Sequence, residues 1–240
     1  LFDIDGTLTY PMQKMEGRHV YTFLNWMQNK NVYLVAGSDY GKIAKQLPFS
    51  VLNRCNGVFT CMANELRVGQ KVIYQNEFKP PIRLQNLLLD FKQESKCPNK
   101  KKDFVETRTG MINFSTLGRS ASQKEREEYF AWDKKNKERI KIAKKIEKEF
   151  PELEAKIGGQ ISIDVQRLGS NKSQASKWVR ENVGGKIVYF GDKFGKDGND
   201  YDIMIDVNRE NGVAHRVNSP VDTFKILSEV SPYNINSTVP

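Results

Sequence analysis

Short apolar runs alternate with helical stretches at both ends of this chain, and that alternation constrains the fold more than any other feature. An apolar run leads into Asp3, a helical stretch covers residues 16–29, and a second apolar run at 31–36 precedes a helix from Tyr40. The rhythm returns with a helix at 173–181, a strand at 187–190 and a helix after Val221. Strands and helices in this order favour a parallel sheet covered by helices.

The middle of the chain breaks this rhythm. It predicts a strand at 72–74, a helix at 82–94, and a hairpin whose strands, 104–107 and 111–115, meet at Arg108-Thr109-Gly110. A long charged helix at 122–150, broken at Asp133 or Asn136, precedes a strand at 161–165. We therefore predict an α/β fold with a discontinuous core and an inserted α+β domain. The core comprises residues 1–76 and 169–240 and carries a parallel Rossmann-like sheet, and the insertion spans residues 77–168.

Composition bears on the cellular location of this chain. No window approaches 18 consecutive apolar residues, and the start lacks the pattern of a secretory signal, so we expect a cytoplasmic protein with no membrane segment. Only Leu1 and Phe2 precede the first aspartate, which is short for a strand, so we expect further residues before Leu1. The polar tail at 231–240 is expected to fray. The three cysteines lack metal-ligand spacing and are interpreted as reduced structural thiols.

The net charge of +9 suits nucleic acid, an anionic membrane surface or small phosphorylated substrates. Its distribution decides among them. The densest basic stretch, residues 124–148, also carries five glutamates and is typical of a solvated helix face of mixed sign. We therefore predict no nucleic-acid partner and favour a small phosphorylated substrate.

Two carboxylates follow the first apolar run. Asp3 and Asp5 are two residues apart, so on a strand both side chains point to the same side. One carboxylate can attack phosphorus while the other exchanges protons with the leaving and incoming oxygens. We assign Asp3 as nucleophile and Asp5 as general acid/base. Two carboxylates beside a phosphate repel each other, so the pair calls for a hard cation with oxygen ligands, most simply Mg²⁺.

Later residues complete this chemistry. Ser38 follows a predicted strand within Gly37-Ser38-Asp39, Lys172 precedes a predicted helix, and the strand at 187–190 delivers Gly191-Asp192 to its end. Together with the string Asp-x-Asp-Gly-Thr-Leu-Thr, these pieces resemble the four motifs of the haloacid dehalogenase superfamily in their order. The resemblance implies that Ser38 holds the transferring phosphoryl group and that Lys172 offsets its charge. It also implies metal binding by Asp3, Asp5, Asp192, Asn199 and Asp200.

The inserted segment narrows the resemblance. Its strings Arg108-Thr-Gly-Met-Ile-Asn113, Gly118-Arg119-Ser120, Glu125-Arg126 and 158–165 are similar to the type-IIB cap of eukaryotic phosphomannomutases. The similarity extends from Asp3 to about Leu227. By resemblance, the cap residues that contact a hexose phosphate are Arg108, Arg119, Arg126, Ser162 and Asp164. A second cation site involving Met204 and Asp206 is also implied.

The same resemblance implies an activity. It is the interconversion of mannose 1-phosphate and mannose 6-phosphate by an intramolecular phosphotransferase, an isomerase that supplies GDP-mannose synthesis. A hexose 1,6-bisphosphate would act as activator, and the chains would pair into a homodimer through their caps. A sugar phosphatase or a phosphoglucomutase on the same fold remains an alternative, as does a non-catalytic anion-binding protein.

Several positions depart from the family pattern. Met12 stands where the family usually has a substrate-contacting arginine, for which Lys14 is a candidate replacement. Ala36 takes the place of a glycine, and Asn171 replaces an aspartate before the motif lysine. Ala63-Asn64-Glu65-Leu66 replaces Glu-Asn-Gly-Leu. None of these changes touches the four primary motif positions.

Overall fold

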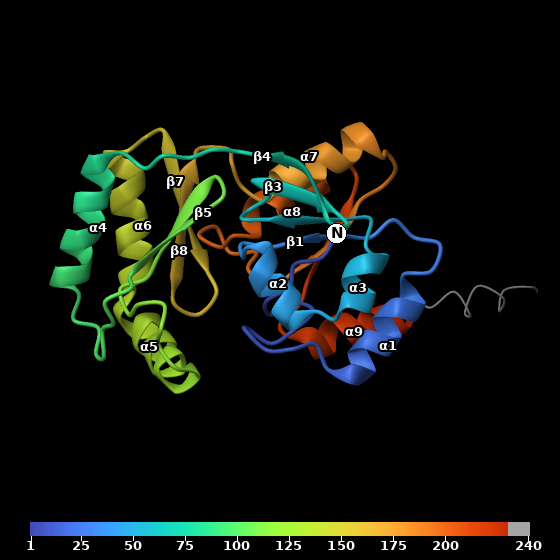
Figure 1. The fold of residues 1–240 in the computed structure, drawn as a ribbon, viewed down its shortest axis with the longest axis horizontal. Coiled ribbons are helices and arrows are strands. Elements are labelled where there is room, and N and C mark those ends of the chain that lie inside the picture. The colour runs from blue at the N-terminus through green and yellow to red at the C-terminus, as the bar shows by residue number, and fades with distance from the viewer. Residues whose placement is uncertain (230–240) are drawn as a thin grey trace, which may run out of the picture.

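The computed structural model describes residues 1–229 as a core and a cap that lie side by side (Figure 1). In the core, β1 and β2 are parallel, and β3 and β4 extend this sheet as antiparallel strands. Strands β9 and β10 form a second parallel pair. Phe2 forms parallel bridges to both β1 and β9 and so joins the two groups. The strands are β1 (Tyr33–Val35), β2 (Gly57–Thr60), β3 (Glu65–Val68), β4 (Lys71–Gln75), β9 (Val188–Gly191) and β10 (Val213–Arg216).

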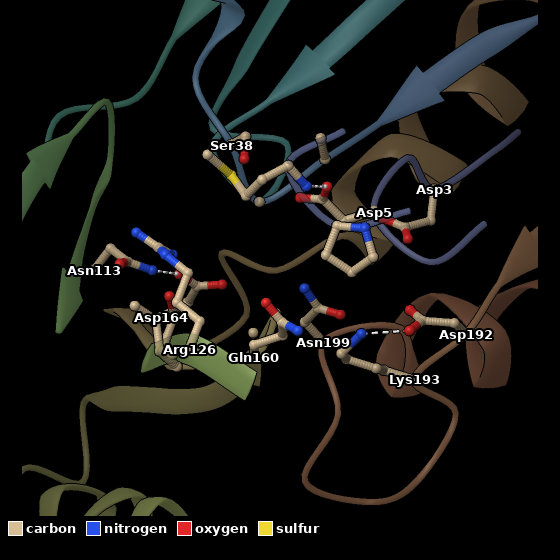
Figure 2. Close-up of a pocket in the computed structure, with 18 of the residues that line it drawn as sticks. Asp3, Asp5, Ser38, Asn113, Arg126, Gln160, Asp164, Asp192, Lys193 and Asn199 are labelled. Carbon is tan, nitrogen blue, oxygen red and sulfur yellow. Dashed lines mark hydrogen bonds and ion pairs between the residues drawn. The ribbon is translucent and has the colours of Figure 1, made fainter. Parts of the chain in front are cut away.

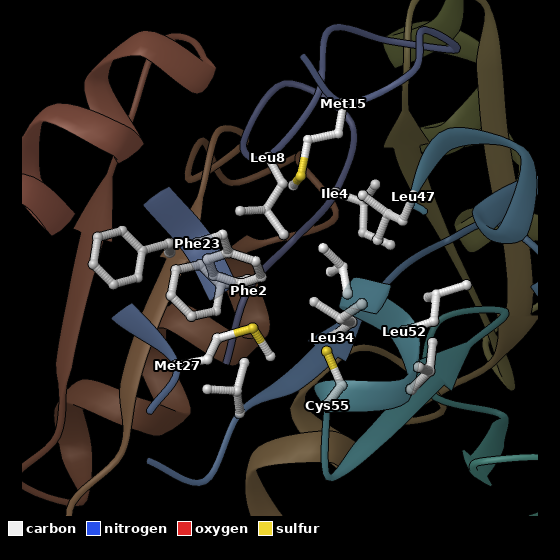
Figure 3. Close-up of a cluster of buried hydrophobic side chains, with 14 of the residues drawn as sticks. Phe2, Ile4, Leu8, Met15, Phe23, Met27, Leu34, Leu47, Leu52 and Cys55 are labelled. Carbon is white, nitrogen blue, oxygen red and sulfur yellow. The ribbon is translucent and has the colours of Figure 1, made fainter. Parts of the chain in front are cut away.

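Helices cover both faces of the core sheet because its strands are apolar on both sides. Leu34 packs with α1, α2, α3 and α9, whereas Tyr33 and Val35 pack with α7 and α8. Figure 3 shows the first of these clusters, in which the rings of Phe2 and Phe23 pack edge to face. The helices are α1 (Gly17–Trp26), α2 (Tyr40–Gln46), α3 (Phe49–Arg54), α7 (Ser173–Asn182), α8 (Tyr201–Arg209) and α9 (Pro220–Glu229).

The cap is an antiparallel sheet in the order β5-β6-β8-β7, with α4 and α6 packed on one face. Ile112 and Phe114 of β6 and Ile163 and Val165 of β8 point into that apolar layer. The alternate residues of both strands therefore face the core domain. The elements are α4 (Ile82–Glu94), β5 (Val105–Arg108), β6 (Met111–Phe114), α5 (Gln123–Asn136), α6 (Glu138–Glu149), β7 (Leu153–Gly158) and β8 (Ser162–Arg167).

The predicted α/β class with a parallel sheet and a cap is confirmed, and the predicted helices and hairpin have structural counterparts. The exact boundaries near residues 76 and 168 stay predictions. The long charged helix breaks after Asn136, where Lys137 adopts a left-handed φ of 57° and separates α5 from α6. Within residues 1–229, no helix is both long and apolar enough to cross a membrane. The predicted fraying at 231–240 lies outside the described residues.

The altered turn before β3 is held by side chains. Cys61, Met62 and Ala63 all have positive φ, a conformation that costs of order 1 kcal/mol for each such residue. Asn64 donates from Nδ2 to the Cys61 carbonyl at 2.8 Å. The buried Glu65 carboxylate accepts from Thr60 Oγ1 at 3.1 Å. These hydrogen bonds stabilise the turn despite the departure from the family pattern.

Candidate active site

The carboxyl ends of neighbouring parallel strands bring the predicted core residues together. Asp3 leaves the sheet directly after the Phe2 bridges, Ser38 follows β1, and Asp192 follows β9. Asp3, Ser38 and Asp192 line one pocket between core and cap, together with Asp5 and Asn199 (Figure 2). The carboxyl edge of a parallel sheet is where open α/β folds bind ligands.

Lys172, the residue that caps the start of α7, sits at the centre of a buried charge cluster. Its Nζ donates to Asp3 Oδ1 at 2.5 Å and to Asp200 Oδ1 at 2.7 Å, and its side chain is fully buried. Burial raises the pKa of Asp3 to about 7, because desolvation and the nearby carboxylates of Asp200 and Asp192 outweigh the ammonium of Lys172. Burial alone would lower the pKa of Lys172, but the carboxylates of Asp200 and Asp3 outweigh burial and raise it.

The acidic residues fit a hard cation. Asp3, Asp192 and Asp200 each offer a carboxylate oxygen, and these oxygens lie within 4.8 Å of one another. Among the described residues, Asp192 Oδ1 is buried without a hydrogen-bond partner, as expected of an atom that binds a metal ion. Asp200 already accepts from Lys172, from the Tyr189 hydroxyl and from two backbone N–H groups. Asp3 and Asp192 are therefore the better direct ligands, and Asp200 orients the cluster.

Gly6 is required by this cluster. Its φ is +92°, and a Cβ added to it would lie 2.4 Å from Asp192 Oδ2. We expect Gly6→Ala to displace Asp192 and to lower Mg²⁺ affinity at least about tenfold, as for lost support of a metal ligand. The measurement is the Mg²⁺ dependence of the melting temperature.

Gly69→Ala is the matched control for that change. Gly69 also has a positive φ, +57°, but among the described residues nothing lies within 4 Å of its added Cβ. This variant should lose stability through backbone strain alone and keep its Mg²⁺ dependence. Equal Mg²⁺ affinities in the two glycine variants would contradict the assignment of Asp192.

Asp5 is held by two donors on one oxygen. Its Oδ1 accepts from the Met12 backbone N–H at 3.0 Å and from Gln46 Nε2 at 2.6 Å. The other oxygen has the freedom to exchange a proton with a ligand in the pocket. Met12 itself lines the pocket at a left-handed φ of 64°, whereas Lys14 is exposed and is not among the described lining residues. The structure therefore does not support Lys14 as the replacement for the family arginine.

Side chains from β6 and β8 form the cap wall of the pocket. Asn113 and Asp164 are register partners, and Asn113 Nδ2 donates to Asp164 Oδ1 at 2.5 Å. Ser162 accepts from Arg119 NH1 at 2.8 Å. Ser162 and Asp164 lie on the face opposite Ile163, as the strand pattern predicts.

Three guanidinium groups gather at this cap wall. Arg108, Arg119 and Arg126 all line the pocket. Burial lowers the pKa of Arg119 to about 10, and the neighbouring positive charge of Arg108 adds to this effect. A cluster of cations that repel one another favours an anion, and guanidiniums bind phosphate through paired hydrogen bonds. The pocket thus has carboxylates at its core end, with the buried Lys172 behind Asp3, and arginines at its cap end.

Met204 and Asp206 lie elsewhere. Both are on α8, and in the described part of the chain neither lines the pocket. The Asp206 carboxylate pairs with the Arg180 guanidinium at 2.9 and 2.8 Å and accepts from the Ser176 hydroxyl. A second metal ion at Asp206 would have to compete with the Arg180 guanidinium, and this site stays a prediction.

A buried carboxylate of the cap explains why position 171 holds an asparagine in place of the family aspartate. Its Nδ2 donates to Glu154 Oε2 at 3.1 Å, and its Oδ1 accepts from the Ser173 backbone N–H at 3.0 Å. Gln166 Nε2 donates to the other Glu154 oxygen at 3.0 Å. An aspartate at position 171 would place a second carboxylate against Glu154, so the amide suits this site.

Asn171→Asp should therefore destabilise the protein by about 1–3 kcal/mol at pH 7.5. Burial already raises the pKa of Glu154, and a second carboxylate would raise it further. A carboxyl whose pKa is raised in the folded state loses stability as pH rises, so the deficit should shrink at pH 5. Urea unfolding at the two pH values measures it. Asn86→Asp, on an exposed position of α4, is the control, and a deficit no larger than that of this control would contradict the account.

Comparison with known proteins shows the family of this chain. The model of the eukaryotic phosphomannomutase family matches residues 20–232. The phosphomannomutase of Saccharomyces cerevisiae is 37% identical over 96% of this chain and 92% of its own length. That of Spinacia oleracea is 34% identical over 96% of this chain and 94% of its own length. The chain belongs to the eukaryotic phosphomannomutase family.

Solved structures support the fold of this family member. The C-terminal domain of Candida albicans trehalose-6-phosphate phosphatase superposes with a TM-score of 0.68 at 15% identity, covering 96% of this chain and 90% of that one. A haloacid dehalogenase-like hydrolase from Bacteroides thetaiotaomicron gives a TM-score of 0.60 at 12% identity, with 95% and 97% covered. At such identities the likeness concerns the haloacid dehalogenase-like fold alone.

Some pocket residues of this family member were not predicted from the sequence. Lys193 lines the pocket and pairs through its ammonium with Asp192. Its position directly after Asp192 is a signal that could have identified it. Asn113 lies within a string that was quoted for the cap, but its partner Asp164 is remote in sequence. Gln160 lines the pocket and lies within the string 158–165, whereas Gln46, which contacts Asp5, carries no local signal.

Proposed function

We propose that this protein is a phosphomannomutase, which interconverts mannose 1-phosphate and mannose 6-phosphate through an aspartyl phosphate. Family membership supports this activity. The observation that carries the proposal is a single pocket with two ends that suit phosphate. Asp3 with Lys172 lies at one end, and the arginines of the cap lie at the other. A monophosphate sugar held at the arginine end presents its free hydroxyl to the core end.

In the proposed reaction, Asp3 carries a phosphoryl group obtained from a hexose 1,6-bisphosphate activator. The hydroxyl oxygen of the bound sugar attacks phosphorus, the bond between phosphorus and Asp3 breaks, and the hydroxyl proton passes to Asp5. Lys172 balances the negative charge that returns to Asp3. In the reverse step Asp5 returns the proton to the leaving oxygen. Asp5 lines the pocket, where it can exchange a proton with the hydroxyl of a bound sugar.

The bisphosphate formed in this way must reorient in the pocket before its other phosphate reaches Asp3. Both orientations present a phosphate to the cap, where Arg108, Arg119 and Arg126 line the pocket. When bound at Asp3 and Asp192, Mg²⁺ would offset the charge that the carboxylates and the phosphoryl group bring together. Ser38 lines the same region and is proposed to donate to a phosphoryl oxygen.

Product analysis tests this function. The protein is given mannose 1-phosphate, a trace of glucose 1,6-bisphosphate and Mg²⁺, and mannose 6-phosphate is compared with inorganic phosphate. A mutase gives mostly mannose 6-phosphate. Mostly inorganic phosphate would overturn the proposal in favour of a sugar phosphatase. Parallel runs with glucose 1-phosphate measure phosphoglucomutase activity.

The remaining parts of the proposal draw on family membership. They are a cytoplasmic enzyme that supplies GDP-mannose synthesis and a homodimer paired through the caps. Sedimentation of the purified chain tests the dimer. A single species with the mass of one chain at micromolar concentration would contradict it.

A further inference from the structure

One ion pair joins core and cap beside the pocket. Lys42 lies on α2 of the core, and its Nζ contacts Glu106 Oε1 on β5 of the cap. The same ammonium is 3.2 Å from Asp39 Oδ2, at the N-cap of α2. The side chains of Lys42 and Glu106 are 22% and 27% exposed, so the pair stands at the edge of the interface rather than inside it.

Glu106 also contacts two of the pocket arginines. It accepts from Arg108 NH2 at 2.7 Å and lies 3.3 Å from Arg119 Nε. Arg108 in turn donates from NH1 to the Gly37 carbonyl of the core at 2.7 Å, next to Ser38. A single carboxylate therefore connects a core ammonium with the guanidiniums that face the ligand.

The charges keep this connection intact at neutral pH. Burial favours the protonated acid, but Arg108 and Lys42 outweigh it and lower the pKa of Glu106 to about 2. Lys42 and Glu106 are 64 residues apart, and neither belongs to the segments at 76–81 and 168–172 that link core and cap. If the cap opens by a hinge motion at those segments, Lys42 and Glu106 separate, and when the cap closes they pair again.

We propose that Lys42 and Glu106 form a closure pair that keeps the cap shut while Asp3 carries the phosphoryl group, and so limits its loss to water. The inference rests on the proposed function. With the cap shut, the sugar hydroxyl attacks phosphorus, the Asp3–phosphorus bond breaks, and the proton goes to Asp5. With the cap open, a water oxygen attacks the same phosphorus, the same bond breaks, the water proton goes to Asp5, and inorganic phosphate leaves. The closure pair acts on water access and is a positioning pair, not a catalytic one.

The test measures the ratio of inorganic phosphate to mannose 6-phosphate in the product assay. Lys42→Met removes the core side of the closure pair and leaves the arginines in place. We expect the ratio to rise about fivefold, the scale expected from losing a partly exposed ion pair. Lys42→Arg should restore the wild-type ratio, because it can pair with Glu106 again. Lys45→Met, an exposed lysine of the same helix, is the control and should match wild type.

Glu106→Gln separates closure from arginine positioning. It should raise the phosphate ratio as Lys42→Met does and also raise KM, because Arg108 and Arg119 lose their shared carboxylate. Melting temperatures of all variants exclude simple unfolding. If Lys42→Met and Lys45→Met gave the same ratio, the closure pair would be refuted. Failure of the proposed function would look different, because the wild-type protein itself would then release mainly inorganic phosphate.

Discussion

Asp3→Asn should abolish phosphoryl transfer, with a fall in kcat of about 10⁴-fold or more, as expected for loss of a catalytic nucleophile. The amide cannot form the acyl phosphate, although Thr7 and Lys172 still surround the position. Steady-state assays with mannose 1-phosphate and glucose 1,6-bisphosphate measure the loss. Asp90→Asn, at an exposed position of α4, is the control and should keep wild-type activity.

Binding of a phosphoryl analogue gives Asp3→Asn a second readout. Beryllofluoride with Mg²⁺ should raise the melting temperature of wild type, because it binds the folded carboxylate, and should not raise that of Asp3→Asn. Equal shifts in both proteins, or more than a hundredth of wild-type activity in the variant, would remove Asp3 as nucleophile. No shift and no turnover in wild type would favour the non-catalytic anion-binding alternative.

Lys172→Met should lower the free energy of unfolding by about 3–5 kcal/mol, the scale for removing one partner of a buried charge cluster. The side chain of Lys172 is fully buried, and its loss leaves Asp3 and Asp200 facing each other without a cation. The pKa of Asp3 already lies above its unfolded value and would rise further without the ammonium, and the pKa of Asp200 would lose the cation that lowers it. Because both changes disfavour the charged carboxylates of the folded state, the deficit should grow as pH increases from 6 to 8.

Urea unfolding in the presence of EDTA measures this deficit, provided that wild type and variant have equal m-values. Lys177→Met, at an exposed position of the same helix, is the control and should stay within about 0.5 kcal/mol of wild type. A loss below about 1 kcal/mol in Lys172→Met would show that the cluster is not the buried, charged assembly described above.

The alternating ends of the chain were predictable because local patterns agree with tertiary structure there. The cap strand β7 was not predicted, since Glu154 and Lys156 interrupt its apolar pattern. Their partners are remote: Glu154 accepts from Gln166 and Asn171, and Lys156 pairs with Asp202 of the core at 3.1 Å. Strands β2 and β3 were not predicted either: β2 has only four residues and starts at Gly57, and β3 begins shortly after three residues of positive φ.

The break in the long charged helix was predicted at Asp133 or Asn136 and falls at the next residue, Lys137. Asp133 contributes indirectly, because its carboxylate accepts from the Arg139 backbone N–H at 3.0 Å and from Arg139 Nε at 2.8 Å. It thereby supports the first turn of α6. The sequence located the break to within a few residues, and the side-chain contacts set its position.

The core site was predictable to the extent that its motifs are contiguous. Asp3 and Asp5 stand in one string, and Asp192, Asn199 and Asp200 stand in one loop. Contacts across long separations were not predictable. Examples are the contact of Gln46 with Asp5 and the pairing of Arg180 with Asp206, a carboxylate that was predicted to bind a second cation. The Lys42–Glu106 pair is another, because it joins residues 64 positions apart across the core and the cap.

Single-turnover discharge of the phosphorylated protein tests the central claim most directly. The protein is mixed with glucose 1,6-bisphosphate and Mg²⁺, freed of excess bisphosphate, and divided into two portions. One is quenched in acid and digested, and the other is mixed with mannose 1-phosphate. We predict one phosphoryl group on the peptide that contains Asp3, and its transfer to mannose 1-phosphate to give the bisphosphate. A phosphoryl group on another residue, or discharge mainly as inorganic phosphate, would contradict the account.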